Sequence, residues 1–191
     1  MWLLVVPLYF GWVLARRVYQ TQVWYSVLGL SIALPCALFL EAVNLLCHWI
    51  PVSQASYVVS TLMLLCALWL QRRLPTSPIV MPPKKVTLWL VTFSSLIWVY
   101  TTVCQNTSPD DDYWIHTPIE ARLAYAKEAN PGGITIPHPF FPDIQMSGHY
   151  GRDLLVAALS SYTHKDVYFT QVWLTSVLSL ATFLILYGLV E

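Results

Sequence analysis

The segment KKVTLWLVTFSSLIWVYTTVCQNTSPDDD, residues 84–112, predicts both the fold class and the topology of this chain. A basic pair, Lys84 and Lys85, precedes an apolar run from Val86 to Cys104, and three aspartates close the segment. A run of about 20 mostly apolar residues is long enough to span a bilayer as a helix. The segment is therefore expected to cross a membrane with its basic and acidic ends on opposite sides.

The composition of the whole chain agrees with a membrane protein. Hydrophobic residues make up 57% of the 191 residues and charged residues 10%, against about 25% charged residues in a typical soluble domain. The nine Trp and eleven Tyr suit a protein with many side chains at membrane–water interfaces. The formal net charge is zero. The charge balance thus gives no indication of a nucleic-acid partner, and the lipid bilayer is the expected environment.

Five apolar runs are expected to form transmembrane helices, so the predicted fold is an all-α membrane protein. The predicted spans are Trp2–Leu14, Val23–Cys47, Ala55–Leu70, Val86–Cys104 and Val167–Val190. The first run is short, and a signal peptide is the alternative interpretation. It lacks a basic start and a small-residue cleavage site, and its positive charges follow the apolar run, which favours an uncleaved span.

The basic residues predict the orientation of these spans. Six of them fall into two connections that share one side once the spans alternate: Arg16, Arg17, Arg72, Arg73, Lys84 and Lys85. Because cytoplasmic loops are enriched in Lys and Arg, the N-terminus and residues 105–166 are expected outside a plasma membrane of prokaryotic type. The expected organisation is a four-helix membrane region (1–104), an extracytoplasmic loop (105–166) and a final span (167–191).

The outer loop, residues 105–166, holds eight of the ten acidic residues and four of the five histidines. Within it, Thr117-Pro118-Ile119-Glu120 matches a capping box with proline at the first helical position. A helix from Pro118 to Ala129 is therefore expected, lying along the membrane surface. The apolar run Leu154–Leu159 is too short to span and predicts a second surface helix or a re-entrant one.

The three aspartates Asp110, Asp111 and Asp112 have two interpretations. Negative charge is favourable at a helix N-terminus, so the group could be a solvated acidic cap. Alternatively, Asp111 and Asp112 could bind a divalent cation such as Mg²⁺ or Mn²⁺, or a carboxylate could deprotonate an acceptor hydroxyl. His116 lies one helical turn after Asp112 and could share its face.

The second half of the chain adds a resemblance. Four features follow one another there. They are an apolar helix, the Asp cluster with an aromatic residue and His116, a surface helix, and the segment PHPFFPDIQMSGHYGRDLL (residues 137–155). Together they resemble the GT-C superfamily of polytopic membrane glycosyltransferases, over residues 86–191. The resemblance implies an enzyme that transfers a sugar from a polyprenyl-phosphate donor on the extracytoplasmic face of the membrane.

The same resemblance implies roles for individual residues. Asp111 or Asp112, and less directly Asp110, would act as the catalytic base or metal-site residue. Arg152 would hold the donor phosphate, because a guanidinium matches phosphate oxygens bidentately. The substrate site would comprise four residues: His116, His149, Tyr150 and Arg152.

The chain also departs from the usual pattern of that superfamily. Four predicted spans precede the Asp-bearing loop instead of one, and one span follows it instead of many. The expectation is therefore an N-terminal portion of a larger enzyme, a split subunit that packs against membrane helices of another chain, or a relic without activity. A non-catalytic membrane subunit that binds a partner protein through the outer loop is the main alternative. A carrier or channel is disfavoured because the spans show no internal repeat.

Overall fold

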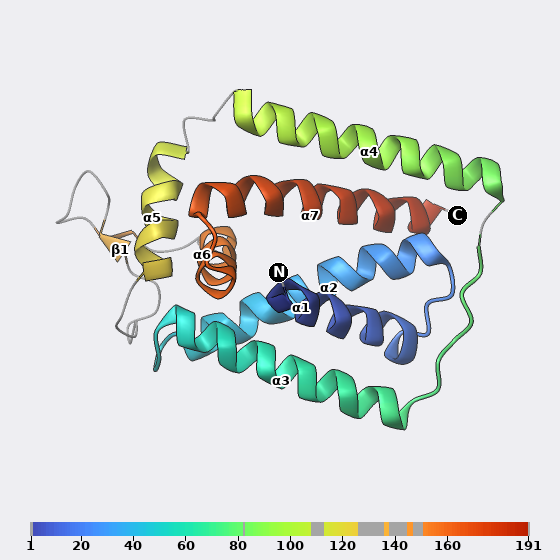
Figure 1. Ribbon diagram of the computed structural model, residues 1–191, viewed down its shortest axis with the longest axis horizontal. Helices are drawn as coiled ribbons and strands as arrows, with labels where there is room; N and C mark the ends of the chain where they lie inside the picture. Colours follow the sequence, from blue (N-terminus) through green and yellow to red (C-terminus); the bar gives the residue numbers. More distant parts are fainter. Residues whose placement is uncertain are drawn as a thin grey trace.

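The computed structural model describes residues 2–81, 83–107, 113–125, 136–137, 145–146 and 151–190, and these are predominantly helical (Figure 1). The first half contains α1 (Trp2–Val13), the π-helical turn η1 (Leu14–Val18), α2 (Trp24–Leu46), α3 (Val52–Arg73) and α4 (Lys84–Thr107). The second half contains α5 (Tyr113–Tyr125), α6 (Gly151–Thr163), α7 (Val167–Val190) and the antiparallel strands β1 (Ile136–Pro137) and β2 (Gln145–Met146). The predicted class, an all-α membrane protein, is confirmed.

Four of the described helices are long and apolar enough to cross a membrane: α2, α3, α4 and α7. They correspond to four of the five predicted spans, and α7 has the predicted bounds. The remaining prediction, Trp2–Leu14, coincides with α1 and the start of η1, which are 12 and 5 residues long. These two pieces together fall below the roughly 20 residues of a typical span, so that fifth span stays a prediction.

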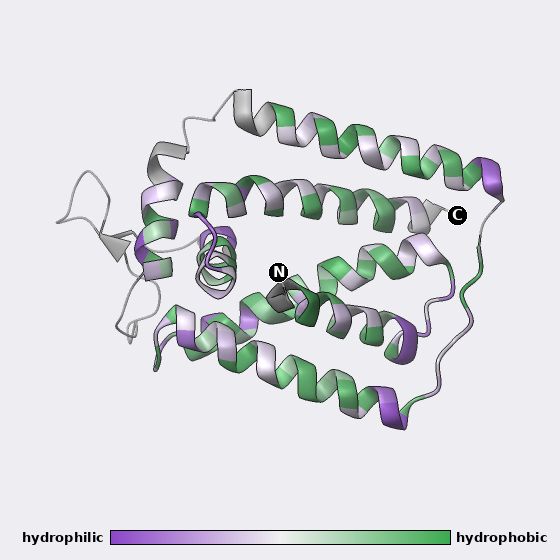
Figure 2. Cartoon of the chain, viewed as in Figure 1, coloured by the Kyte–Doolittle hydropathy of each residue, from purple (hydrophilic) through white to green (hydrophobic). Residues whose placement is uncertain are grey.

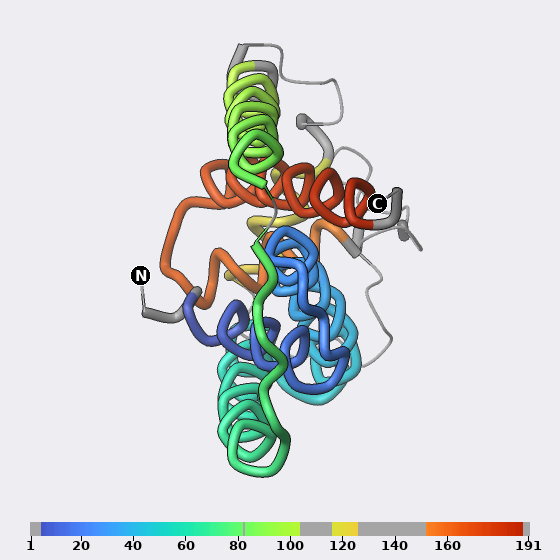
Figure 3. The backbone as a smooth tube through the Cα atoms, turned by 90° about the vertical axis from the view of Figure 1, so that its right-hand side faces the viewer, coloured from blue at the N-terminus to red at the C-terminus, as the bar shows by residue number. Residues whose placement is uncertain are grey.

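The long helices form layers, with α7 between α4 on one side and α2 on the other (Figures 1 and 3). Apolar contacts hold these layers together, since Ile32 of α2 packs with Val177 and Ala181 of α7. Polar contact adds to the α4–α7 interface, where the hydroxyls of Thr101 and Ser176 lie 3.1 Å apart. α1 packs against α2 and α3 on the far side of the bundle.

Basic residues gather at one end of this bundle, as predicted from their spacing in the sequence. η1 and α3 each end in an arginine pair, and α4 begins with Lys84 and Lys85. The hydrophilic ends of these helices lie at the same end of the molecule (Figure 2). Arg16 and Arg17 donate hydrogen bonds to the backbone carbonyls of Ser77 and Leu74, which ties η1 to the segment that connects α3 with α4.

The crossing of α1 and α2 depends on a glycine. A Cβ atom at Gly11 would lie 2.2 Å from the backbone oxygen of Ser31 and 2.7 Å from the ring of Pro35. The nearest obstacle is backbone, which cannot rotate away as a side chain can. The absence of a side chain at position 11 therefore permits the close approach of the two helices.

We expect the substitution Gly11→Ala to lower the thermal stability of the detergent-solubilised protein. Forcing a methyl group into a filled interface costs about 1–3 kcal/mol, and here α1 must separate from α2 to accommodate it. The matched control is Val5→Ala, at a position of α1 that is 53% exposed, and it should leave the melting temperature nearly unchanged. Equal melting temperatures for Gly11→Ala and the wild type would contradict the close packing.

Candidate functional site

α5, α6 and α7 meet at the end of the bundle opposite the basic residues (Figure 1). A short turn fixes the relation between α6 and α7. His164 ends α6 with a φ of 54°, in the left-handed region, and the Asp166 carboxylate accepts a hydrogen bond from the Phe169 amide at 3.1 Å. Asp166 thereby caps α7. The turn joins the last residues of α6 to the first residues of α7.

α5 differs from the predicted helix in its start. It begins at Tyr113, so Thr117 is not its N-cap and Pro118 lies inside it. The proline removes one backbone hydrogen bond from the first turns. Burial of Ile119 and Leu123 compensates for that loss. The prediction of a helix starting at Pro118 is therefore wrong, and residues 126–129 lie outside the described residues.

Of the two predictions for Leu154–Leu159, the surface helix is wrong and the re-entrant helix stays a prediction. All six residues are buried within the bundle, with exposed fractions of 6% or less. α6 packs against α5, α3, α7 and α2. Such complete burial places the polar residues at the start of α6 against neighbouring helices, where they need partners.

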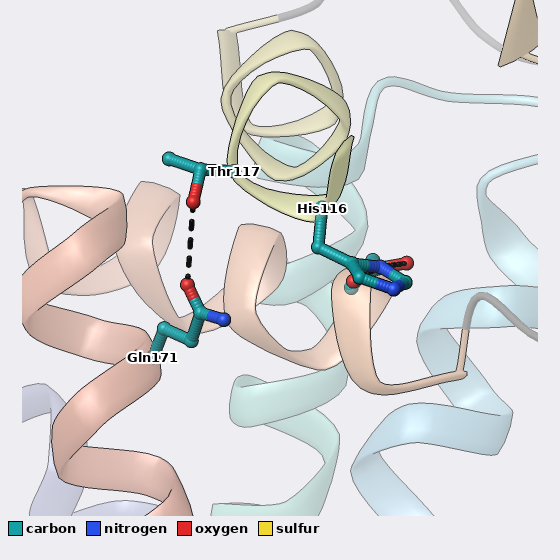
Figure 4. A network of polar contacts seen from close by, with 4 residues as sticks. His116, Thr117 and Gln171 are labelled. Carbon is teal, nitrogen blue, oxygen red and sulfur yellow. Dashed lines mark hydrogen bonds and ion pairs between the residues drawn. The ribbon is translucent and has the colours of Figure 1, made fainter. Parts of the chain in front are cut away.

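Asp153, in the first turn of α6, finds its main partner on α5. Nδ1 of His116 lies 2.9 Å from each carboxylate oxygen of Asp153 (Figure 4). Asp153 is completely buried, whereas the side chain of His116 is 29% exposed. The imidazole therefore joins a buried carboxylate on one side and reaches the surface of the bundle on the other.

Glu120 lies one helical turn after His116 and is also completely buried. Burial in apolar surroundings, followed by the nearby charge of Asp153, raises the pKa of Glu120 from 4.5 to about 9. The pKa of Asp153 is also raised by burial, but hydrogen bonds from His116 and Glu120 and the charge of Arg152 oppose that shift. Near neutral pH Glu120 therefore carries a proton that it donates to Asp153, which holds the negative charge.

Gln171 of α7 connects this carboxyl pair to Arg152. With its amide oriented to satisfy both neighbours, the NH₂ group donates to Oε2 of Glu120 at 3.2 Å and the oxygen accepts from the Arg152 guanidinium. The Thr117 hydroxyl lies 3.5 Å from the same amide (Figure 4). Gln171 thus joins α7 to Glu120 of α5 and to Arg152 of α6.

A groove runs from this cluster along one stripe of α7. Its volume is about 570 Å³, and Arg152 lines the end nearest the cluster. Its apolar lining residues are Leu174, Leu178, Phe183 and Leu186. The hydroxyls of Thr175 and Thr182 also lie in the groove, but each donates to a backbone oxygen of its own helix. The groove thus combines one guanidinium with a largely apolar wall.

Two of the predicted site residues, His116 and Arg152, belong to this cluster. The other five predicted residues lie outside the described residues: Asp110, Asp111, Asp112, His149 and Tyr150. Their roles, including metal binding by Asp111 and Asp112, therefore stay predictions. Within the described part of the chain, no three His, Cys, Asp or Glu side chains group as metal ligands would.

The sequence analysis missed three residues of the cluster: Glu120, Asp153 and Gln171. The helical spacing of four between His116 and Glu120 was a usable signal, because such residues share a helix face. Gln171 was detectable as the one amide side chain in the predicted span Val167–Val190. Asp153 gave no signal beyond its position next to Arg152.

No protein-family model matches this chain, and no match was found among the curated proteins or the solved structures. A function must therefore be inferred from the geometry and charge of the cluster and the groove.

The raised pKa of Glu120 predicts a pH-dependent stability. Between pH 4.5 and about 9 the folded chain keeps a proton that the unfolded chain releases. Each unit of pH increase then lowers the free energy of unfolding by up to about 1.4 kcal/mol. The stabilisation is fully present below the unfolded pKa of 4.5, and it is lost as the pH rises through the folded pKa of about 9.

We therefore expect Glu120→Gln to flatten the pH dependence of the melting temperature and to be more stable than the wild type at the alkaline end. The glutamine has the same shape and can donate to Asp153 without releasing a proton. Glu41→Gln is the matched control, because Glu41 is exposed on α2. Parallel pH profiles for the wild type and Glu120→Gln would show that Glu120 is not buried as a neutral acid.

Proposed function

We propose that this chain is a membrane glycosyltransferase, or part of one, that transfers a sugar from a polyprenyl-phosphate donor at the extracytoplasmic face. The observation that carries the proposal is the position of Arg152, at the head of an apolar groove and beside a buried acid–imidazole cluster. A lipid phosphate has the matching form, an anionic head on a long apolar chain.

The groove suits the apolar part of such a donor. Its lining residues run from Leu174 to Leu186 along α7, a length of about 18 Å at the helical rise of 1.5 Å per residue. This length is enough for several consecutive isoprene units of a lipid chain that lies along the helix. Because the threonine hydroxyls bond to their own backbone, an isoprenoid chain would leave no hydroxyl of these residues unsatisfied.

The charge of the cluster suits the phosphate of such a donor. Glu120 is neutral near pH 7, so Asp153 alone contributes a negative charge beside Arg152 and His116. Gln171 holds Arg152 through a neutral amide oxygen, which does not cancel the positive charge of the guanidinium. Arg152 can therefore still attract a phosphate, and its planar donors match phosphate oxygens.

The remaining features of the proposal rest on residues outside the described ranges. Asp111 or Asp112, with Asp110, would complete the catalytic site next to α5, and Mg²⁺ or Mn²⁺ is the proposed divalent cation. His149 and Tyr150 precede Gly151, the first residue of α6, and would approach the donor from that side.

The proposal requires the cluster to face the outside of a prokaryotic plasma membrane. Basic residues favour the cytoplasmic side, and they gather at the opposite end of the bundle. Single cysteines at the exposed positions Lys165 and Lys85, in a cysteine-free background, test this orientation. A membrane-impermeant maleimide should label intact cells at position 165 but not at position 85. The reverse pattern would contradict an extracytoplasmic site.

Arg152→Ala is expected to reduce donor turnover about tenfold to a hundredfold, since hydrogen bonds to charged groups are worth about 1.5–3 kcal/mol. Arg152→Lys should recover only part of the loss, because lysine keeps the charge but not the bidentate geometry. The assay measures release of polyprenyl phosphate from polyprenyl-phosphate hexoses and pentoses in proteoliposomes. Arg122→Ala, at an exposed position of α5, is the matched control. Full activity of a folded Arg152→Ala protein would rule out this phosphate site.

One observation favours the alternative of a non-catalytic membrane subunit. α4 packs chiefly against α7, and the outer face of α4 exposes large side chains such as Leu88, Trp89 and Tyr100, each 63–70% exposed. Membrane helices of another chain could cover that face. Inactivity of the wild-type chain towards every donor would favour this alternative.

A further inference from the structure

The pairing of His116 with Asp153 fixes which imidazole nitrogen is available for chemistry. Both oxygens of Asp153 lie 2.9 Å from Nδ1, and an ionised carboxylate can only accept hydrogen bonds. Nδ1 must therefore carry the proton. In the neutral imidazole the other nitrogen, Nε2, is then an unprotonated acceptor.

The surroundings of the pair suit a proton acceptor. Among the described residues, the charged or titratable groups around the His116 imidazole are Asp153 and Arg152 from α6 and Glu120 from α5. Because Glu120 is neutral, Asp153 is the anion that stabilises an imidazolium, and Glu120 keeps Asp153 ionised by donating a hydrogen bond to it. The partial exposure of His116, 29% of its side chain, allows a substrate hydroxyl to approach.

We propose that His116 is a catalytic base that accepts the proton of the attacking hydroxyl through Nε2, with Asp153 as the positioning residue that holds the imidazole. This inference rests on the proposed function, because it assigns a role within sugar transfer from a lipid phosphate. It places the base on α5, in contact with α6, the helix that also carries Arg152.

The step balances without any further reactant. The acceptor hydroxyl gives its proton to Nε2 of His116, and its oxygen forms a bond to the anomeric carbon of the sugar. The bond between that carbon and the phosphate oxygen breaks, and its electron pair leaves with the polyprenyl phosphate beside Arg152. His116 becomes an imidazolium that still donates from Nδ1 to Asp153, and it returns to the neutral form by releasing a proton to water.

The test compares His116→Gln, His116→Gly and Asp153→Asn in the full chain, with His48→Gln as the matched histidine control. The probe is a panel of polyprenyl-phosphate hexoses and pentoses with water as the acceptor, and thermal melting confirms that each variant is folded. General base catalysis is worth about a hundredfold to ten-thousandfold. We expect a loss in that range for His116→Gln and partial recovery of His116→Gly by added imidazole, which a purely structural histidine would not show.

A second readout does not depend on activity. ¹⁵N NMR of labelled histidines should show His116 protonated at Nδ1 in the wild type, and Asp153→Asn should disturb that preference, because an asparagine amide can also donate to the ring. A wild-type tautomer that Asp153→Asn leaves unchanged would overturn the positioning role of Asp153.

The outcomes separate the two proposals. If the wild type releases polyprenyl phosphate and folded His116→Gln does so within a few-fold of its rate, the base assignment is wrong and the proposed function stands. If Asp111→Asn plus Asp112→Asn abolishes release while His116→Gly is not restored by imidazole, the base is one of those aspartates and not His116. If the wild type releases nothing from any donor, the proposed function fails and the base assignment fails with it.

Discussion

The arrangement of α5, α6 and α7 depends on the cost of burying two carboxyl groups in an apolar bundle. An isolated charge in such surroundings is strongly unfavourable, so a buried acid must be neutral or paired. Glu120 meets this requirement by keeping its proton, and Asp153 meets it by pairing with His116. Because these partners come from two helices, the requirement also fixes the position of α5 on α6.

Gln171 extends this constraint to the membrane-spanning part of the bundle. Its amide bridges Glu120 and Arg152, so α7 shares the network that joins α5 and α6. α7 is also the helix that packs between α2 and α4 and provides the wall of the groove. One helix therefore connects the polar cluster, the apolar groove and the core.

The sequence and the structure agree best where the physical requirement is local. The apolar runs of α2, α3, α4 and α7 are set by the thickness of a bilayer. They disagree at α5 and α6, where the local pattern was misleading. Thr117 and Pro118 have the local pattern of a helix start, yet the helix begins at Tyr113 because packing on α6 outweighs one missing hydrogen bond.

The sequence by itself determined that this is an all-α membrane protein, that α2, α3, α4 and α7 are long and apolar enough to cross a membrane, and that basic residues gather at one end. These properties follow from the hydrophobicity and charge of continuous segments, which do not depend on what packs beside them. Only the tertiary structure decided that Glu120, Asp153, His116, Arg152 and Gln171 form one cluster. Their protonation and pairing arise from contacts across up to 51 positions of the chain, counted from Glu120 to Gln171, and the pattern within a single helix does not specify these contacts.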